Sequence, residues 1–360
     1  MRILKRAISL FLVLIFVLSF PLYNSAAALA FTDPTQITDI INRYSFDEDN
    51  EYTIVDSIPM RSFVDDSEQY TLYLLAPYGY AILYNETNGF MEGCYSENTF
   101  VEQMEDQTTY YYGGPGNYYT YNGEHYCSLI SGDVLESTAI QSLANAEEIV
   151  RANEDATQDT TAISPRGLIY NDREVVVAES YFSNLVKYGE NVDGTCTVLA
   201  IAILLGYYDE FVDDDYVLDR YRDGNGTNED FHQTLINFVY EDDAPGGLYI
   251  RDALDGINWY LDFYDISSRL YALYGSPGRV ANKIVSMLES GYPVVASMGT
   301  GYGGPYNHTA VVYGAIYNTT TSVLASGVYQ VHMGWGEEYG ASGRSFSARA
   351  TWFYECGYIQ

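Results

Sequence analysis

Residues 196–208 read CTVLAIAILLGYY, and this stretch decides the fold of the C-terminal half of the chain. Apolar side chains occupy every side of the helix that it predicts, whereas a surface helix keeps one polar face. A turn signal, NVDGT at 191–195, comes directly before it. We therefore predict a helix that is buried on all sides and begins at Cys196.

The segments after this helix predict three further helices and then a series of strands. One helix begins at Thr227, a good N-cap, another spans about 256–273, and a third begins at Ser276-Pro277 and ends at Gly291. The predicted strands, rich in β-branched and aromatic residues, are 292–298, 308–317, 328–335 and 345–354. Helices followed by antiparallel strands indicate an α+β fold.

The N-terminal half has a different pattern. Residues 71–93, TLYLLAPYGYAILYNETNGFMEG, predict antiparallel strands separated by turns. We interpret the tyrosines of 108–126, TTYYYGGPGNYYTYNGEHY, as exposed aromatic surface among turns. A helix is predicted over 135–153.

A polar, proline-containing stretch follows this helix and predicts a linker at 156–167. The chain of 360 residues also exceeds the usual size of a single hydrophobic core, which favours two domains. We expect a small α+β domain over 31–155 and a second domain over 168–360.

Residues 1–30 have the pattern of a secretory signal peptide. Basic residues precede an apolar run at 8–22, and small residues follow up to Ala30. The competing interpretation is a membrane anchor, but the run is shorter than the roughly 20 apolar residues that a span needs. We expect a secreted protein, extracellular or associated with the cell wall, with no membrane partner after signal cleavage.

The composition narrows the classes of partner and cofactor. A formal net charge of −32 argues against nucleic acid and anionic membranes as partners, because both would repel the chain. The acidic run at 209–219 lacks the glycine and the final glutamate of a calcium-binding loop, and the glycines of 299–304 lack the context of a dinucleotide site. We expect no metal and no cofactor.

The four cysteines, Cys94, Cys127, Cys196 and Cys356, are too few for a disulfide scaffold in an exported chain of this size. Cys94 and Cys127 are the pair that an N-terminal disulfide would use. A thiol that stays free outside the cell needs an explanation, and catalysis is one.

Cys196 and His308 are the candidate catalytic pair. A thiol at a helix start lies near the positive end of the helix dipole, which favours the thiolate; the alternative is a small buried core residue. His308 begins an apolar strand after a glycine-rich stretch, whereas His125 and His232 have no other sign of a site. An imidazole in this position can take the thiol proton and later protonate a leaving amine.

Three segments resemble the bacterial papain-like cysteine peptidases, in particular streptopain and the peptidases of bacteriocin-processing type. Residues 193–209, DGTCTVLAIAILLGYYD, resemble their nucleophile helix, and 307–317, NHTAVVYGAIY, resemble the strand of the catalytic histidine. Residues 329–339, YQVHMGWGEEY, resemble the strand after it. The resemblance covers about 165–360, and the sheet and Tyr-Gly-Gly-Pro segments of the N-terminal half resemble a streptopain-like propeptide.

The resemblance also implies roles for three further residues. His332 stands where the family has the asparagine that orients the catalytic imidazole, and a neutral imidazole can also supply an acceptor; the alternative is a buried structural residue. Asn191 can donate to an oxyanion together with the Cys196 N–H, or it is a simple turn former. Trp335 corresponds to a family tryptophan beside the histidine.

The expected function is therefore that of a secreted zymogen. The C-terminal domain would have the papain-like fold and hydrolyse peptide bonds of a peptide or protein substrate through an acyl-enzyme. The N-terminal domain would be its intramolecular inhibitor until cleavage in the linker. Two alternatives remain: an inactive peptidase fold used as a binding module, and a transpeptidase or amidase that acts on cell-wall peptides.

Overall fold

The structure is a computed structural model of the chain. It describes residues 34–46, 50–95, 100–105, 108–130, 132–158, 172–184, 194–222, 229–240, 247–299, 308–318, 327–334 and 346–360. The chain separates into one unit that ends at Asp39 and another, Ile40–Gln360. Helix α2 (Pro34–Arg43) crosses that boundary, and the description below concerns the second unit. The predicted signal peptide lies outside the described residues.

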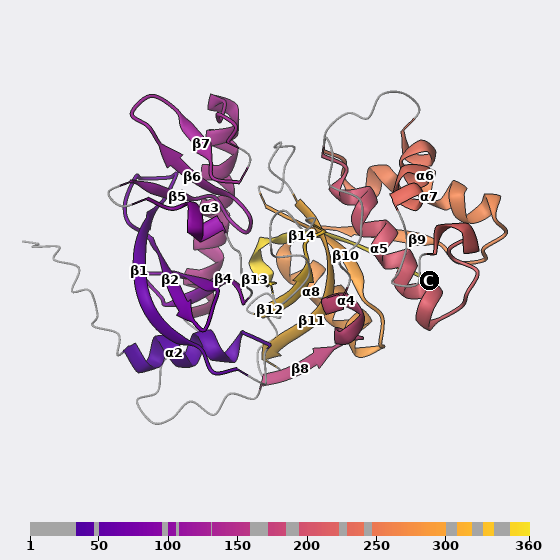
Figure 1. Cartoon of the computed structure of the whole chain (residues 1–360), viewed down its shortest axis with the longest axis horizontal. Helices are drawn as coiled ribbons and strands as arrows, with labels where there is room; N and C mark the ends of the chain where they lie inside the picture. The colour runs from indigo at the N-terminus through magenta and orange to yellow at the C-terminus, as the bar shows by residue number, and fades with distance from the viewer. Residues whose placement is uncertain are drawn as a thin grey trace, which may run out of the picture. The chain divides into compact units, whose positions relative to one another are not determined.

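The strands of this unit belong to one sheet, whose described pairs are antiparallel except for β1 with β5 (Figure 1). In order across the sheet they are β7 (Tyr126–Ser128), β6 (Tyr118–Tyr121), β5 (Tyr110–Tyr112), β1 (Thr53–Arg61), β2 (Tyr70–Ala76), β3 (Tyr80–Tyr84), β4 (Gly89–Cys94), β13 (Phe346–Arg349), β12 (Val328–His332), β11 (His308–Asn318), β10 (Val294–Met298), β14 (Phe353–Ile359) and β9 (Leu270–Tyr274); β8 (Asp172–Val176) pairs with β11. With the helices below, these strands confirm the α+β class.

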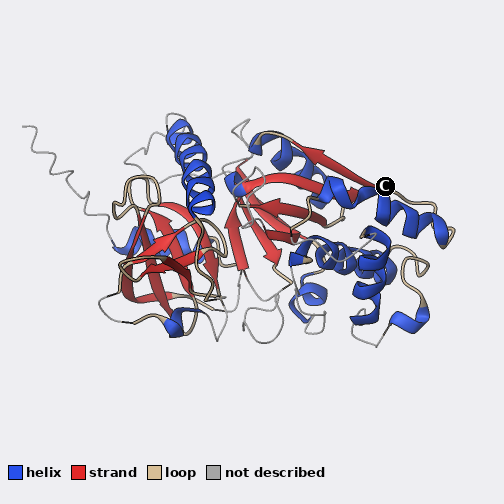
Figure 2. Cartoon of the chain, turned by 90° about the horizontal axis from the view of Figure 1, so that it is seen from above, coloured by secondary structure: helices blue, strands red, loops and turns tan. Residues whose placement is uncertain are grey.

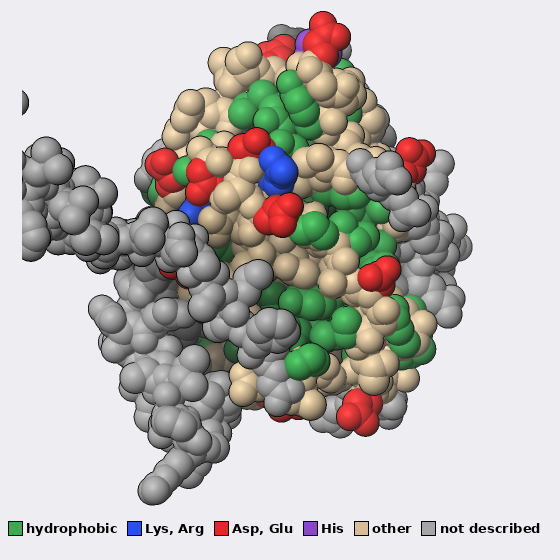
Figure 3. All heavy atoms as spheres, turned by 90° about the vertical axis from the view of Figure 1, so that its left-hand side faces the viewer, with side chains coloured by type: hydrophobic (Ala, Val, Ile, Leu, Met, Phe, Trp, Pro, Cys, Tyr) green, Lys and Arg blue, Asp and Glu red, His purple; other side chains and the backbone are tan. Residues whose placement is uncertain are grey.

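Most tyrosines of β5 and β6 form core instead of the aromatic surface that the sequence predicted, although Tyr121 is 40% exposed. Five of them are at most 4% exposed: Tyr110, Tyr111, Tyr112, Tyr118 and Tyr119. Two of them, Tyr112 (2.9 Å) and Tyr118, donate their hydroxyls to a buried carboxylate, Glu92 on β4, which also accepts a hydrogen bond from Tyr80 on β3 (3.1 Å). On the face of the N-terminal part seen in Figure 3, the hydrophobic side chains form separate patches among polar and acidic ones.

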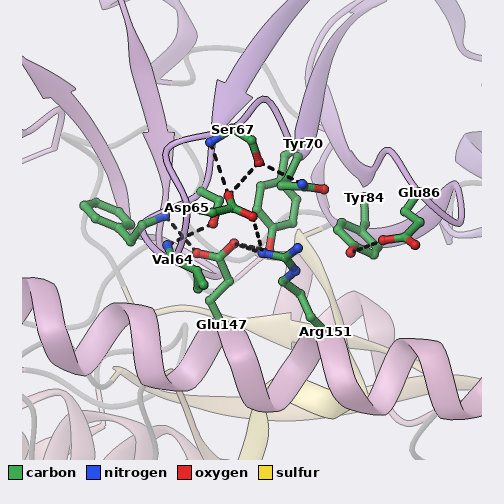
Figure 4. A network of polar contacts seen from close by, with 11 residues as sticks. Val64, Asp65, Ser67, Tyr70, Tyr84, Glu86, Glu147 and Arg151 are labelled. Carbon is green, nitrogen blue, oxygen red and sulfur yellow. Dashed lines mark hydrogen bonds and ion pairs between the residues drawn. The ribbon is translucent and has the colours of Figure 1, made fainter. Parts of the chain in front are cut away.

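Helix α3 (Ser137–Gln158) is held against the N-terminal strands by a polar network (Figure 4). Glu147, 1% exposed, accepts hydrogen bonds from the Phe63 N–H (2.9 Å) and the Tyr70 hydroxyl (3.0 Å). One turn later Arg151 forms an ion pair with Asp65 at 3.3 Å. The helix confirms the one predicted at 135–153 but runs further, so the predicted linker begins in its last residues and otherwise lies outside the described residues.

The N-terminal and C-terminal parts of the sheet meet where β4 pairs with β13, with Cys94 opposite Phe346. Trp352, 2% exposed, packs edge-on against Tyr112 with ring centroids 6.0 Å apart. Gly114, at a φ of 103°, passes so close to the indole that an added Cβ would lie 2.7 Å from it. The domain boundary that the sequence predicted stays a prediction.

The buried helix is α5 (Cys196–Phe211), as the sequence predicted, and its first 13 residues are buried. It packs against β10 and β11. The other helices of this part are α4 (Glu179–Asn184), α6 (Glu229–Val239), α7 (Ile250–Phe263) and α8 (Pro277–Glu289). Figure 2 shows helices on both sides of the C-terminal strands, and every residue of β10, which contacts α5 and α8, is buried. Every residue of β12 is buried as well.

Two predictions for this part are wrong in detail. The helix expected over 256–273 begins at Ile250 and ends at Phe263, because Asp265 takes a φ of 58° and Leu270–Tyr274 pairs with β14 as β9. The strand expected over 345–354 is two strands, β13 and β14, separated by a 3₁₀ turn at Ala350–Trp352. The turn carries the chain from beside β12 to beside β10.

No helix among the described residues has the length and apolar character needed to cross a bilayer. All four cysteines are free thiols, so Cys94 and Cys127 are not paired.

Candidate active site

Cys196 is the first residue of α5 and is 6% exposed. Gly194, at a φ of 79°, turns the chain into the helix, and Thr195 is the N-cap but makes no side-chain capping bond. The first N–H groups of a helix have no partner within the helix, and they give its start a positive potential. The thiol therefore lies at a position that stabilises negative charge.

His308 begins β11 and forms a hydrogen bond with the Cys196 thiol. Its Nε2 lies 2.6 Å from the backbone carbonyl oxygen of Met333. Because a carbonyl only accepts hydrogen bonds, Nε2 carries a proton, and Nδ1 is the nitrogen that can take the proton of the thiol. The structure thus brings together the two residues that the sequence singled out.

The surroundings favour the thiolate of Cys196. Burial raises the pKa of this thiol, but the hydrogen bond and the charge of His308 oppose that effect, together with the Thr309 N–H and the Thr197 side chain. The balance holds the pKa of Cys196 below its usual value. A lowered thiol pKa is typical of nucleophilic cysteines.

Cys356 shows what burial does without an imidazole. This thiol on β14 is 0% exposed, and burial raises its pKa to about 12, although Lys283 offsets part of the increase. Both cysteines are buried in the same part of the molecule, yet their pKa values shift in opposite directions. His308 is the main difference between the two sites.

His332 is 2% exposed at the end of β12, and its Nδ1 accepts a hydrogen bond from the Gly334 N–H at 3.2 Å. The acceptor for the Nε2 of His308 is the main chain of the next residue, Met333. The sequence assigned that acceptor to the His332 side chain and missed the carbonyl, since a backbone atom has no signature in the sequence. The catalytic role of His332 stays a prediction.

His232 lies closer to the site than the sequence indicated. It is 5% exposed on α6, its ring forms a hydrogen bond to the backbone of Thr195, and its Nε2 has no partner within the described part of the chain. Burial lowers the pKa of this imidazole to about 4. A neutral histidine therefore packs against the residue that precedes Cys196.

The remaining predicted residues, Asn191 and Trp335, lie outside the described residues, and Asn191 stays the predicted oxyanion donor. In the part of the chain that the structure describes, one cluster of acidic side chains has the spacing of metal ligands: Asp213, Asp214 and Asp215. All three are exposed and follow the end of α5 that is remote from Cys196.

The comparisons with known proteins give similar solved structures and no family. No family model and no curated protein matches the chain. The chain is similar to a fragment of prointerpain A from Prevotella intermedia, solved as a cysteine-to-alanine mutant. The identity is 13%, the TM-score is 0.37, and the match covers 84% of this chain and 98% of that one. Nothing in these comparisons supports the bacteriocin-processing type, and we base the function on the geometry around Cys196.

Proposed function

We propose that this chain is a cysteine peptidase of the papain-like, streptopain-related type. The observation that carries the proposal is the hydrogen-bonded pair of Cys196 and His308, in which a buried thiol keeps a lowered pKa at the start of a buried helix. Such a pair is the arrangement that thiol catalysis of acyl transfer requires.

In the proposed reaction, the Cys196 thiolate attacks the carbonyl carbon of a peptide bond. The oxyanion that forms lies near the N–H groups at the start of α5, with Asn191 as the proposed side-chain donor. Protonated His308 gives its proton to the leaving amine, and an acyl-enzyme remains on the sulfur. A water that loses a proton to His308 then hydrolyses the thioester and releases Cys196.

The proposal includes secretion and synthesis as a zymogen. The N-terminal part would act as the intramolecular inhibitor, and cleavage in the 156–167 linker would relieve it. Strand β4 pairs with β13, and Tyr112 packs against Trp352. These contacts support the proposal that the N-terminal part stays bound to the C-terminal part until they are broken.

The test is incubation of the full chain, after proteolytic cleavage in the 156–167 linker, with an unfolded protein substrate in water enriched in ¹⁸O, followed by mass spectrometry. Hydrolysis by this chain predicts new carboxyl termini that contain ¹⁸O, and loss of at least about 99% of the activity in Cys196→Ala. The control is Cys356→Ala, which removes the other buried thiol of this part and should keep the activity.

Two results would oppose the proposal. Amide products without ¹⁸O would indicate transfer to an amine, as in a transpeptidase. Equal product formation by Cys196→Ala would mean that the thiol does not act, and the chain would then be an inactive peptidase fold.

A further inference from the structure

Three buried hydroxyl groups form a chain of hydrogen bonds directly beside the catalytic pair. The Ser297 and Thr309 hydroxyl oxygens lie 3.0 Å apart, and those of Thr309 and Thr197 lie 2.9 Å apart. Thr197 in turn donates to the Leu248 carbonyl oxygen at 2.5 Å. Ser297 is 1% exposed, Thr309 3% and Thr197 0%, so water does not substitute for these bonds.

The carbonyl at one end sets the direction of the whole chain. Leu248 contributes an oxygen that only accepts, so the single hydroxyl proton of Thr197 is used there. Thr197 must then accept from Thr309, and Thr309 must accept from Ser297. Each hydroxyl has one proton, and this is the one arrangement in which all three are used along the chain. Hydrogen bonds aligned in this way strengthen one another.

The chain connects the elements that carry the two reacting groups. Thr197 follows Cys196 on α5, Thr309 follows His308 on β11, and Ser297 lies opposite Thr309 on β10. The Thr309 N–H also forms a hydrogen bond to the Cys196 thiol. The residues that follow Cys196 and His308 are therefore joined by a hydrogen bond, which holds the start of α5 against the start of β11.

We infer that Thr197, Thr309 and Ser297 are positioning residues that hold Cys196 and His308 at hydrogen-bonding distance. The inference rests on the proposed function, since it concerns the same pair. The Thr309 hydroxyl bonds to other hydroxyls, whereas the Thr197 side chain also lies at hydrogen-bonding distance from the Cys196 thiol. Their effect comes from fixing α5 against β11, and a small shift between these elements would weaken the pair before any loss of fold.

The test compares Thr309→Val with Thr309→Ser in the full chain. Valine has the shape of threonine without the hydroxyl, and serine restores the hydroxyl. The readout is the pH dependence of the alkylation of Cys196 by iodoacetamide, because a merely structural role would lower stability without moving this profile. We expect the midpoint to rise by about one pH unit in Thr309→Val, since one net hydrogen bond corresponds to roughly that shift. Thr309→Ser should stay within a few tenths of a unit of wild type.

The matched control is Thr351→Val. Thr351 is 3% exposed in the 3₁₀ turn, and its hydroxyl has no hydrogen-bond partner among the residues that the structure describes. Its removal should leave the alkylation profile unchanged. If Thr309→Val does not fold, as judged by its unfolding transition, Ser297→Ala removes the donor at the open end of the chain and should raise the midpoint by a smaller amount.

A wild-type profile in folded Thr309→Val and Ser297→Ala would overturn the inference, as would an equal shift in Thr351→Val. The outcome is separable from that of the proposed function. A shift in Thr309→Val without any peptide hydrolysis by wild type would support the positioning role and refute the peptidase. Hydrolysis by wild type with no shift in the variants would support the peptidase and refute the positioning role.

Discussion

Glu92 in the N-terminal part and Cys196 in the C-terminal part are both buried among hydrogen-bond donors, with opposite results. Glu92 receives three tyrosine hydroxyls, yet burial dominates and raises the pKa of this carboxyl to about 7. Cys196 is also buried, yet the pKa of its thiol falls below the usual value. The difference lies in the partner, because His308 can become positively charged and the tyrosines stay neutral.

Neutral donors offset only part of the cost of moving a charge out of water, whereas an opposite charge at hydrogen-bonding distance can offset all of it. The N-terminal site therefore favours an uncharged carboxyl and contributes a packed core. The C-terminal site favours the thiolate of Cys196 and is suited to chemistry. The two predictions below vary the charge at Glu92 and then at His232, the histidine that packs against the residue before Cys196.

The larger effect is expected at Glu92. Its pKa in the folded chain, about 7, lies above the ordinary 4.5, so the folded state holds a proton that the unfolded state loses between these values. Stability linked to this group is present below about pH 4.5 and is lost as the pH rises through 7, by about 3 kcal/mol. Glu92→Gln, which cannot ionise, should remove this loss when the free energy of unfolding is measured at pH 4.5 and pH 8.

Glu147→Gln is the control for this prediction, since Glu147 is buried in another network of the same part. Burial also raises its pKa, and a smaller change in the same direction is expected there. If the free energy of unfolding depends on pH as strongly in Glu92→Gln as in wild type, the pKa of Glu92 is not raised in the folded chain. The tyrosines would then stabilise the carboxylate.

The smaller effect is expected at His232, with the opposite sign. Its pKa in the folded chain, about 4, lies below the ordinary 6.5, so the unfolded state binds a proton that the folded state excludes. Stability is complete above about pH 6.5 and is lost as the pH falls towards 4, by at most about 3 kcal/mol. We put the loss below that of Glu92 because His232 keeps 5% exposure.

His232→Asn, which keeps a side-chain N–H for Thr195, should reduce this acid-induced loss of unfolding free energy between pH 7 and pH 4. His125→Asn is the control, because the His125 side chain is 53% exposed. If His232→Asn and wild type lose the same unfolding free energy between pH 7 and pH 4, a group other than His232 causes the loss.

Sequence reasoning worked best where one local pattern determined the structure. An all-apolar run such as the one after Cys196 predicts a helix buried on all sides in a globular fold, and α5 is such a helix. It failed where distant segments decided the outcome. The tyrosines of 110–119 looked solvent-exposed because nothing near them in the sequence points to Glu92, which lies on another strand. Leu270–Tyr274 became a strand because β14 was available to pair with it.

The residues of the candidate site show the same contrast between local patterns and distant contacts. Cys196 and His308 are recognisable because their side chains do the chemistry and their positions on a helix start and a strand start are visible in the sequence. The acceptor for His308 is a main-chain oxygen of Met333, and the Thr197–Thr309 contact joins residues 112 positions apart. Neither the main-chain acceptor nor a contact over that separation has a pattern that a single sequence contains.

The most direct test of the account is the rate of iodoacetamide alkylation at each cysteine of the full chain, followed by mass spectrometry from pH 5 to pH 10. Cys356 is an internal reference, since burial raises the pKa of this thiol to about 12. We predict that Cys196 reacts well below the roughly 8.5 of a free thiol, that Cys356 does not, and that His308→Ala slows Cys196 on the order of 100-fold at pH 6. Alkylation of Cys196 that begins only near 8.5 and is unchanged in His308→Ala would contradict the catalytic pair.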